Sequence, residues 1–461
     1  MRFLRSEKPN IAATGTLFSR QEIKKLLIPL IIEQLLSYLV GLADSVMVAT
    51  AGNAAVSAVS LVDSISVLMV NIFAALAAGG AIVVGQYLGL RSEDQARKAG
   101  QQLLMALLVL SVLLTALLIA FEGGILHLLF GKSDIEVQEN CRIYYHIVML
   151  SVPFIALYNG AAALYRAVGN SRVPMRISML MNVINIVGNG VLIYGFRMGV
   201  AGVAIPTLVS RGVAMVVQLI LVFRPKFTLS VMAAGRYHFE KHTMGQILAM
   251  GIPNGVENGM FQLGKIVLFS LVSTLPTASI TANAIGNTMA NLQGVVGVSI
   301  NLGIVAVVSQ CAGAGDYPQA RWYIRYMVKI TYIGNAIVNI LLFAGMPLIL
   351  KAYGAVGETA RLAVGIMLIH GIFMMLVWPL AFSVNTGMRA AGDARFTMII
   401  AVISMWLCRV GLGHFFVLFC NTGVWGIWYA WIIDWFFRIA FFMPRYYGHK
   451  WETKSIREEN Y

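Results

Sequence analysis

The chain alternates between long apolar segments and short polar ones, and the apolar segments predict its fold. Residues 103–121, LLMALLVLSVLLTALLIAF, form a run of 19 residues without a charge. A helix needs about 20 such residues to cross the hydrocarbon core, whereas the strands of a membrane barrel alternate polar and apolar residues over about ten positions. The pattern therefore predicts an all-α polytopic membrane protein with twelve spans. Their approximate limits are 26–49, 57–83, 99–121, 140–160, 174–195, 199–223, 246–273, 281–308, 323–348, 362–388, 395–420 and 423–445.

The composition of the 461 residues supports this class. Apolar residues make up 59% of the chain and charged residues only 12%, against roughly 25% charged residues in soluble domains. Such a chain has too little polar surface for a water-soluble globule. A soluble enzyme, a disordered protein and a disulfide scaffold are therefore excluded.

Basic residues are concentrated on one side of the predicted spans. The net charge is +14, and 25 Lys and Arg residues fall in or beside the termini and the loops after even-numbered spans, against 4 in the other loops. Short cytoplasmic loops carry such an excess. We expect a multi-pass protein of the cytoplasmic membrane with both termini cytoplasmic, surrounded by lipid and without nucleic-acid partners.

The two halves of the chain match at a shift of 224 residues. Pro29 and Glu33 match Pro253 and Glu257, and further landmarks keep the same register with one single-residue slip. Six spans per half give both halves the same orientation, so the pattern predicts a parallel duplication with substrate bound at the repeat interface. The predicted parts are an N-lobe at 1–223, a cytoplasmic loop at 224–243, a C-lobe at 244–445 and a cytoplasmic tail at 446–461.

Two similar lobes suit transport by alternating access. The sequence has no Walker A motif, so an ion gradient is the expected energy source. It has no segment resembling a channel filter, and no cluster of nucleophiles, acids or metal ligands near one membrane interface. We therefore predict a secondary transporter that is not an enzyme and needs no cofactor.

Ionisable groups within the membrane are functional candidates because burying them is costly. Glu33 and Asp44 are 11 residues apart on span 1, and roughly 100° per residue places both on one helix face. Asn185 and Asn189 share a face of span 5, and Thr207 begins span 6. These groups predict either an oxygen-rich cation site or a hydrogen-bond network around a proton-carrying carboxylate.

The other charged residues within the predicted spans allow more than one interpretation. Asp63 on span 2 either extends the N-lobe site or ties helices together. Glu257 and Lys265 on span 7 are expected to neutralise each other or to pair with Asp434 or Arg438 of span 12, in a structural role.

Two arginines and a set of cavity candidates complete the list. Arg166 and Arg389, each three residues before a glycine, are expected to fix cytoplasmic loops rather than contact substrate. Adaptable and polar side chains on spans 1, 7 and 10 are weaker candidates for the lining of a substrate cavity. They are Gln34, Tyr38, Glu257, Met260, Phe261, Gln262 and Trp378.

The sequence resembles the MATE (multidrug and toxic compound extrusion) family of prokaryotic transporters, over residues 20–445. The resemblance implies a V-shaped pair of six-helix lobes and the efflux of organic, often cationic, compounds in exchange for protons or sodium. It is carried by motifs that keep their order across both halves. These are 29–44 with 47–49, Gly52 with Ala54–Ala55, 86–89, 310–313, 166–169 and 199–204.

The resemblance also implies an N-lobe cation site. It assigns the helix 1 acid to Asp44, the helix 5 pair to Asn185 and Asn189, and the helix 6 hydroxyl to Thr207. Asn189 stands where the family has a second acid. In the C-lobe, Gln262 and Trp378 stand at the positions of the acids of the sodium-coupled branch.

The missing acids favour protons over sodium as the coupling ion. We therefore expect a monomeric antiporter that exports small organic, cationic substrates through proton exchange at Asp44, with no metal beyond a possible sodium ion there. Two alternatives stay open: a flippase for a lipid-linked substrate within the same superfamily, and a non-transporting membrane receptor or assembly factor.

Overall fold

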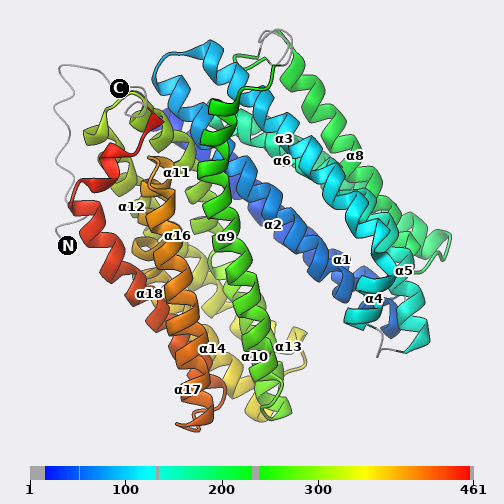
Figure 1. Cartoon of the computed structure of the whole chain (residues 1–461). Helices are drawn as coiled ribbons and strands as arrows, with labels where there is room; N and C mark the ends of the chain where they lie inside the picture. Colours follow the sequence, from blue (N-terminus) through cyan, green and yellow to red (C-terminus); the bar gives the residue numbers. More distant parts are fainter. Residues whose placement is uncertain (1–15, 51, 131–133, 226, 231–237, 457–461) are drawn as a thin grey trace. The chain divides into compact units, whose positions relative to one another are not determined.

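The computed structural model describes residues 16–50, 52–130, 134–225, 227–230 and 238–456, with the exception of the side chains of 128–130. Within these ranges every regular element is a helix (Figure 1). The contacts divide the chain into an N-terminal unit, Lys24–Gly255, and a C-terminal unit made of Val256 onward and the segment before Lys24. The division falls inside one long helix, and the predicted lobe boundaries at 223 and 244 remain a prediction.

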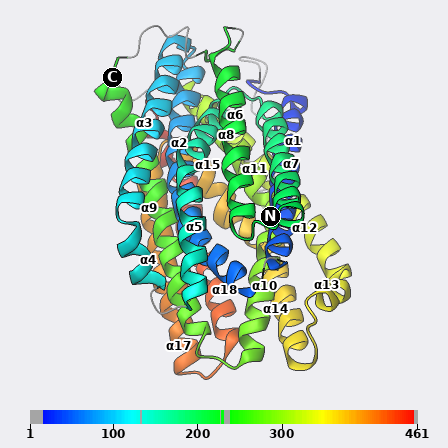
Figure 2. The ribbon, with the colours of Figure 1, turned by 90° about the vertical axis from the view of Figure 1, so that its right-hand side faces the viewer.

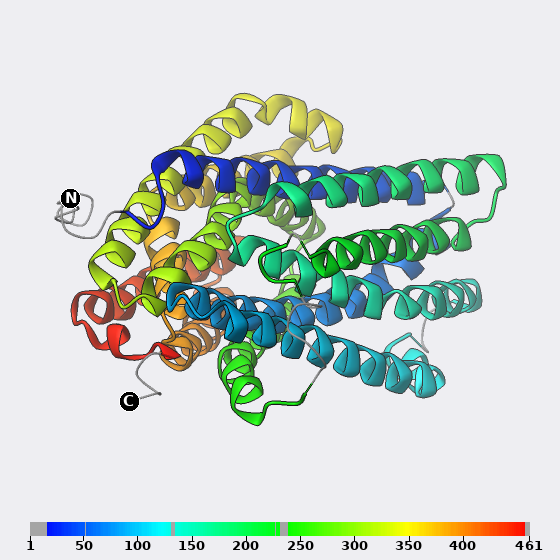
Figure 3. The same cartoon turned by 90° about the horizontal axis from the view of Figure 1, so that it is seen from above.

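The N-terminal unit is built around α2, whose second half is nearly continuous in buried small and branched residues. This helix packs against α3, α5 and α6, and α7 packs against α8. Figures 1 and 3 show α2 and α3 running alongside each other. The elements are α1 (Arg20–Ala49), α2 (Asn53–Gly89), α3 (Glu93–Ala120), α4 (Glu122–Phe130), α5 (Ile135–Leu150), α6 (Val152–Ala167), α7 (Arg172–Asn189), the π-helix η2 (Gly190–Gly195) and α8 (Ala201–Phe223).

The C-terminal unit pairs α10 with α14, α11 with α12, and α18 with η5. Its core includes Trp428, Trp435 and Ile366, each at most 1% exposed. Its elements are α9 (Lys241–Val272), which begins in the other unit, α10 (Thr277–Gln293), α11 (Val295–Gly313), α12 (Tyr317–Ala344), α13 (Met346–Ala352), α14 (Gly357–Leu376), η4 (Pro379–Ser383), α15 (Val384–Ala390), α16 (Ala394–Ile403), η5 (Ser404–Leu412), α17 (Gly413–Leu418), α18 (Val424–Tyr447) and η6 (Lys450–Thr453).

The helices account for the twelve predicted spans. Eleven helical segments in the described residues are long and apolar enough to cross a membrane. The remaining predicted span, 246–273, is the seventh along the chain. It lies in α9, which has 32 residues but carries Glu257 and Lys265 and several amides. Predicted span 281–308 is not one helix, because α10 ends at the Gly294 cap and α11 begins directly after it.

Candidate functional site

Asp44, near the end of α1, accepts hydrogen bonds from the two α7 asparagines. The Asn189 side-chain nitrogen donates to Asp44 Oδ1 at 2.9 Å. With its amide nitrogen turned toward α1, Asn185 donates to Asp44 Oδ1 at 3.0 Å and to Oδ2 at 3.1 Å. The carbonyl oxygen of Asn185 then lies 3.2 Å from Thr207 Oγ1 on α8. The structure therefore brings together four residues that the sequence singled out.

The two amides present nitrogen, rather than oxygen, to the Asp44 carboxylate. Asn189 is fully buried, and its Oδ1 has no hydrogen-bond partner in the described structure. Amide N–H groups stabilise a charged carboxylate, whereas a sodium ion needs several oxygen ligands. These donors stabilise the charged form of the Asp44 carboxylate.

A close approach between α7 and α8 sets the geometry around Asp44. A Cβ on Gly188 would lie 2.7 Å from the Cβ of Pro206 on α8, so only glycine lets the helices come this close. Immediately after Asn189, the α-helix changes to the π-helix η2. Such π segments are frequent at functional sites, because they re-aim neighbouring side chains.

The Gly188 contact gives a test of this packing. We expect Gly188→Ala to lower the stability of the purified protein by about 1–3 kcal/mol, because the proline ring cannot yield as a flexible side chain would. Thermal unfolding in detergent measures the change. Gly195→Ala is the matched control, since a Cβ there meets no atom within 4 Å. Equal melting temperatures for both variants would contradict the proposed contact.

A second carboxylate and a guanidinium lie beside Asp44. Tyr144 on α5 donates its hydroxyl proton to Asp63 Oδ1 at 3.0 Å. Arg211 on α8 interacts electrostatically with Asp44, Asp63 and Tyr144, and its Nη1 donates to Ser151 Oγ at 2.8 Å. Asp63 and Asp44 also interact with each other. Asp63 therefore belongs to the surroundings of Asp44. The sequence analysis missed Arg211, although its place one turn after Thr207 was the available signal.

Glu33 lies on the same helix as Asp44 but has a partner of its own. Arg166 Nη2 at the end of α6 donates to Glu33 Oε1 at 2.6 Å, and both side chains are largely buried. The repeat mates behave alike: Arg389 Nη1 at the end of α15 donates to Glu257 Oε2 at 3.2 Å. The two arginines thus bind helix glutamates in equivalent positions of the two units.

The pairing expected for Glu257 and Lys265 is wrong. Glu257 pairs with Arg389, and Asp434 pairs with Arg438 of its own helix at 3.2 Å. The Lys265 ammonium lies 5.2 Å from the centre of the Phe261 ring. Phe261 and Trp431 also flank Arg409, whose guanidinium is 3.4 Å from the centre of the Trp431 ring. Cation–π contacts thus take the place of the expected ion pairs.

The cavity candidates differ in exposure. Trp378 is 7% exposed and stacks on Phe382 within a core cluster that includes Met374 and Trp435, so its contacts are those of a packing residue. The other candidates are half-buried within their own units. They are Gln34, Tyr38, Glu257, Met260, Phe261 and Gln262.

Comparison with known proteins places this geometry in a family. The MatE family model matches residues 29–191 and 253–415, once in each half of the chain. "Uncharacterized transporter YisQ" of Bacillus subtilis is 24% identical, with 93% of this chain and 94% of that protein covered. "Probable multidrug resistance protein NorM" of Thermotoga maritima is 23% identical, with 95% and 94% covered.

A solved structure supports the same assignment of the fold. It is described as the outward-facing conformation of a multidrug resistance MATE family transporter of the MOP superfamily. The TM-score is 0.87 at 19% identity, with 93% of this chain and 96% of that chain covered. Because the family model matches well over half of the residues and occurs twice, this chain belongs to the MATE family of membrane transporters.

Proposed function

We propose that this transporter exports organic cations in exchange for protons, and that Asp44 carries the proton. The observation that carries the proposal is the hydrogen bonding of Asp44 by the amide nitrogens of Asn189 and Asn185. Family membership supports transport of small organic compounds, and the charges around Asp44 in the N-terminal unit support the choice of ion.

The local charge suits one exchangeable proton. Asp44 and Asp63 contribute two negative charges when ionised, and Arg211 offsets one of them. Tyr144 already donates to Asp63, which leaves Asp44 as the carboxylate with amide donors only. Loss of its charge on protonation removes the electrostatic attraction for a bound cation. The proton and the organic cation therefore compete for one carboxylate. This competition couples the movement of one to the movement of the other, as antiport requires.

The proposal also includes the orientation of the protein in the membrane and its oligomeric state. The basic asymmetry of the loops favours cytoplasmic termini, and two homologous units in one chain are compatible with a monomer. No specific observation favours the two alternatives, a flippase for a lipid-linked substrate and a non-transporting receptor or assembly factor. The relatives named above are described as a transporter and a multidrug resistance protein.

The ion can be tested with the purified protein in liposomes. We expect efflux of a fluorescent organic cation under an imposed pH gradient in sodium-free buffer, with no further gain from an imposed sodium gradient. The reason is that a sodium site needs several oxygens and more negative charge than the Asn189 position provides. Asn189→Asp restores the missing acid and should make efflux sensitive to sodium.

Two outcomes decide the matter. If efflux stops without sodium and returns with sodium at a clamped pH gradient, proton coupling is wrong. Asp63 would then be the residue expected to supply the second negative charge of a sodium site. Efflux that continues without sodium in the wild type, together with sodium sensitivity of Asn189→Asp, supports the proton assignment and the site geometry together.

A further inference from the structure

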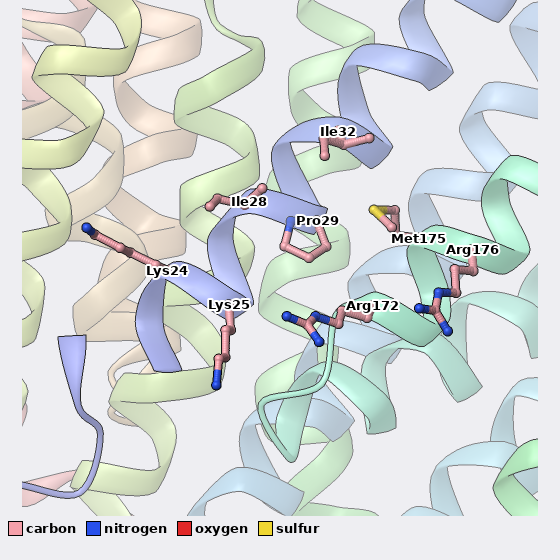
Figure 4. Close-up of a pocket in the computed structure, with 8 residues that line it drawn as sticks. All are labelled: Lys24, Lys25, Ile28, Pro29, Ile32, Arg172, Met175 and Arg176. Carbon is pink, nitrogen blue, oxygen red and sulfur yellow. The ribbon is translucent and has the colours of Figure 1, made fainter. Parts of the chain in front are cut away.

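A basic cavity lies between the beginnings of α1 and α7, away from Asp44. Its volume is about 320 Å³, and Figure 4 shows it between the two helices. Figure 2 shows these helices side by side, and the Ser171 hydroxyl before α7 donates to the Leu26 carbonyl of α1 at 2.5 Å. Four basic and four apolar residues line it. They are Lys24, Lys25, Arg172 and Arg176, with Ile28, Pro29, Ile32 and Met175.

The four cations have no acidic partner in the described part of the chain. Each is exposed, and the ion pairs of the structure involve other residues. Figure 4 shows Lys25 and Arg172 directed into the same opening from the two helices, whereas Lys24 points away from α7. Unpaired basic groups that line one cavity repel one another, and an anion placed among them relieves that repulsion.

The remaining wall of the cavity is apolar and exposed. Ile28 is 55% exposed and Ile32 40% exposed, although both lie on a membrane-spanning helix. Met175 faces them from α7 (Figure 4). An inorganic anion would gain nothing from this surface, whereas a hydrocarbon chain would bury it.

The order of charge and hydrocarbon along both helices matches one leaflet of a bilayer. Lys24 and Lys25 stand immediately before the apolar run that begins at 26, and Arg172 opens α7. Arg176 follows one turn later on the same face. Basic side chains at span ends extend toward lipid headgroups, and basic pockets between spans bind anionic headgroups.

We propose that this cavity binds an anionic phospholipid, with its phosphate between Lys25, Arg172 and Arg176 and an acyl chain along Ile28, Ile32 and Met175. The bound lipid connects the two helices that also carry Asp44 and its asparagines. Anionic lipid in this leaflet therefore holds together the same helix pair that forms the proposed proton site.

The test measures retained lipid by native mass spectrometry. The purified full-length protein is loaded with a mixture of phosphatidylglycerol and phosphatidylcholine and then washed with detergent. We expect one phosphatidylglycerol to remain in preference to phosphatidylcholine. Arg172→Gln/Arg176→Gln should reduce its retention by about thirtyfold, because each basic group near an anionic headgroup contributes a several-fold gain in binding.

Arg91→Gln/Arg395→Gln is the matched control, since it removes two exposed arginines, one between α2 and α3 and one in the first turn of α16, at span ends predicted on the same side. It should retain phosphatidylglycerol as the wild type does, and both variants should elute as folded protein. Equal retention by the cavity variant and the wild type overturns the proposal, as does equal retention of the two lipids. Displacement by millimolar inorganic phosphate would also overturn it, because the apolar wall would then have no role.

Discussion

Asp44→Asn is expected to reduce gradient-driven efflux to the level of protein-free liposomes. The substitution keeps the size of the side chain but removes the charge that Asn185 and Asn189 contact, and it replaces one acceptor oxygen by an NH2 donor. A carboxamide at this position imitates the protonated acid permanently, so the cycle cannot release and rebind a proton. Efflux of a fluorescent cation from proteoliposomes under a pH gradient measures the loss.

A second readout separates coupling from folding. Binding of the cation to the wild type in weakly buffered solution should release about one proton, because proton and cation compete for one carboxylate, and Asp44→Asn should release none. Asp134→Asn, at an exposed position before α5, is the matched control with full efflux. Full efflux by Asp44→Asn would refute the coupling role and direct attention to Asp63.

Breaking the Glu33–Arg166 pair should strongly lower the stability of the fold. Glu33 has a side chain only 5% exposed and Arg166 one 16% exposed, so Glu33→Gln leaves a largely buried guanidinium without its counter-charge. Removing one partner of a buried ion pair costs about 3–5 kcal/mol. We expect a clear fall in the melting temperature and in the yield of folded protein.

The equivalent pair supplies an internal comparison. Glu257→Gln should cost less, because Glu257 and Arg389 are 3.2 Å apart and more exposed, at 15% and 17%. A double-mutant cycle with Arg166→Gln isolates the interaction of Glu33 with Arg166. A cycle that gives no coupling energy would show that the two side chains stabilise the fold independently.

Helical periodicity and the cost of charge in a bilayer explain what could be predicted. They predicted the approximate spans and the faces that carry Asp44, Asn185 and Asn189, since both depend on residues near in sequence. The repeat could be recognised because matching residues recur at a shift of 224. The resemblance to known transporters added the expectation that Thr207 joins them. These groups do meet in the structure.

Contacts across the helix bundle could not be predicted in the same way. Glu257 and Arg389 are 132 residues apart, and no local pattern shows which helix faces α9. Lys265 was expected to pair with a carboxylate, but its ammonium group lies over the aromatic ring of Phe261. Arg211 went unassigned because its one local signal, the place one turn after Thr207, does not show that it also interacts with Asp63 of another helix.

The repeated glutamate–arginine pair bears on the history of the chain. Two copies of one ion pair, each joining the first helix of a half to a later one, are most simply inherited from a single six-helix ancestor. The proposed proton site has no such twin: 224 positions beyond Asp44, Thr207 and Arg211 stand Leu268, Trp431 and Trp435. After gene duplication the ion pair was kept in both copies, whereas the polar cluster around Asp44 was retained or acquired in only one. If the proposed function is correct, a transport cycle with one proton site is the evolutionary outcome of that asymmetry.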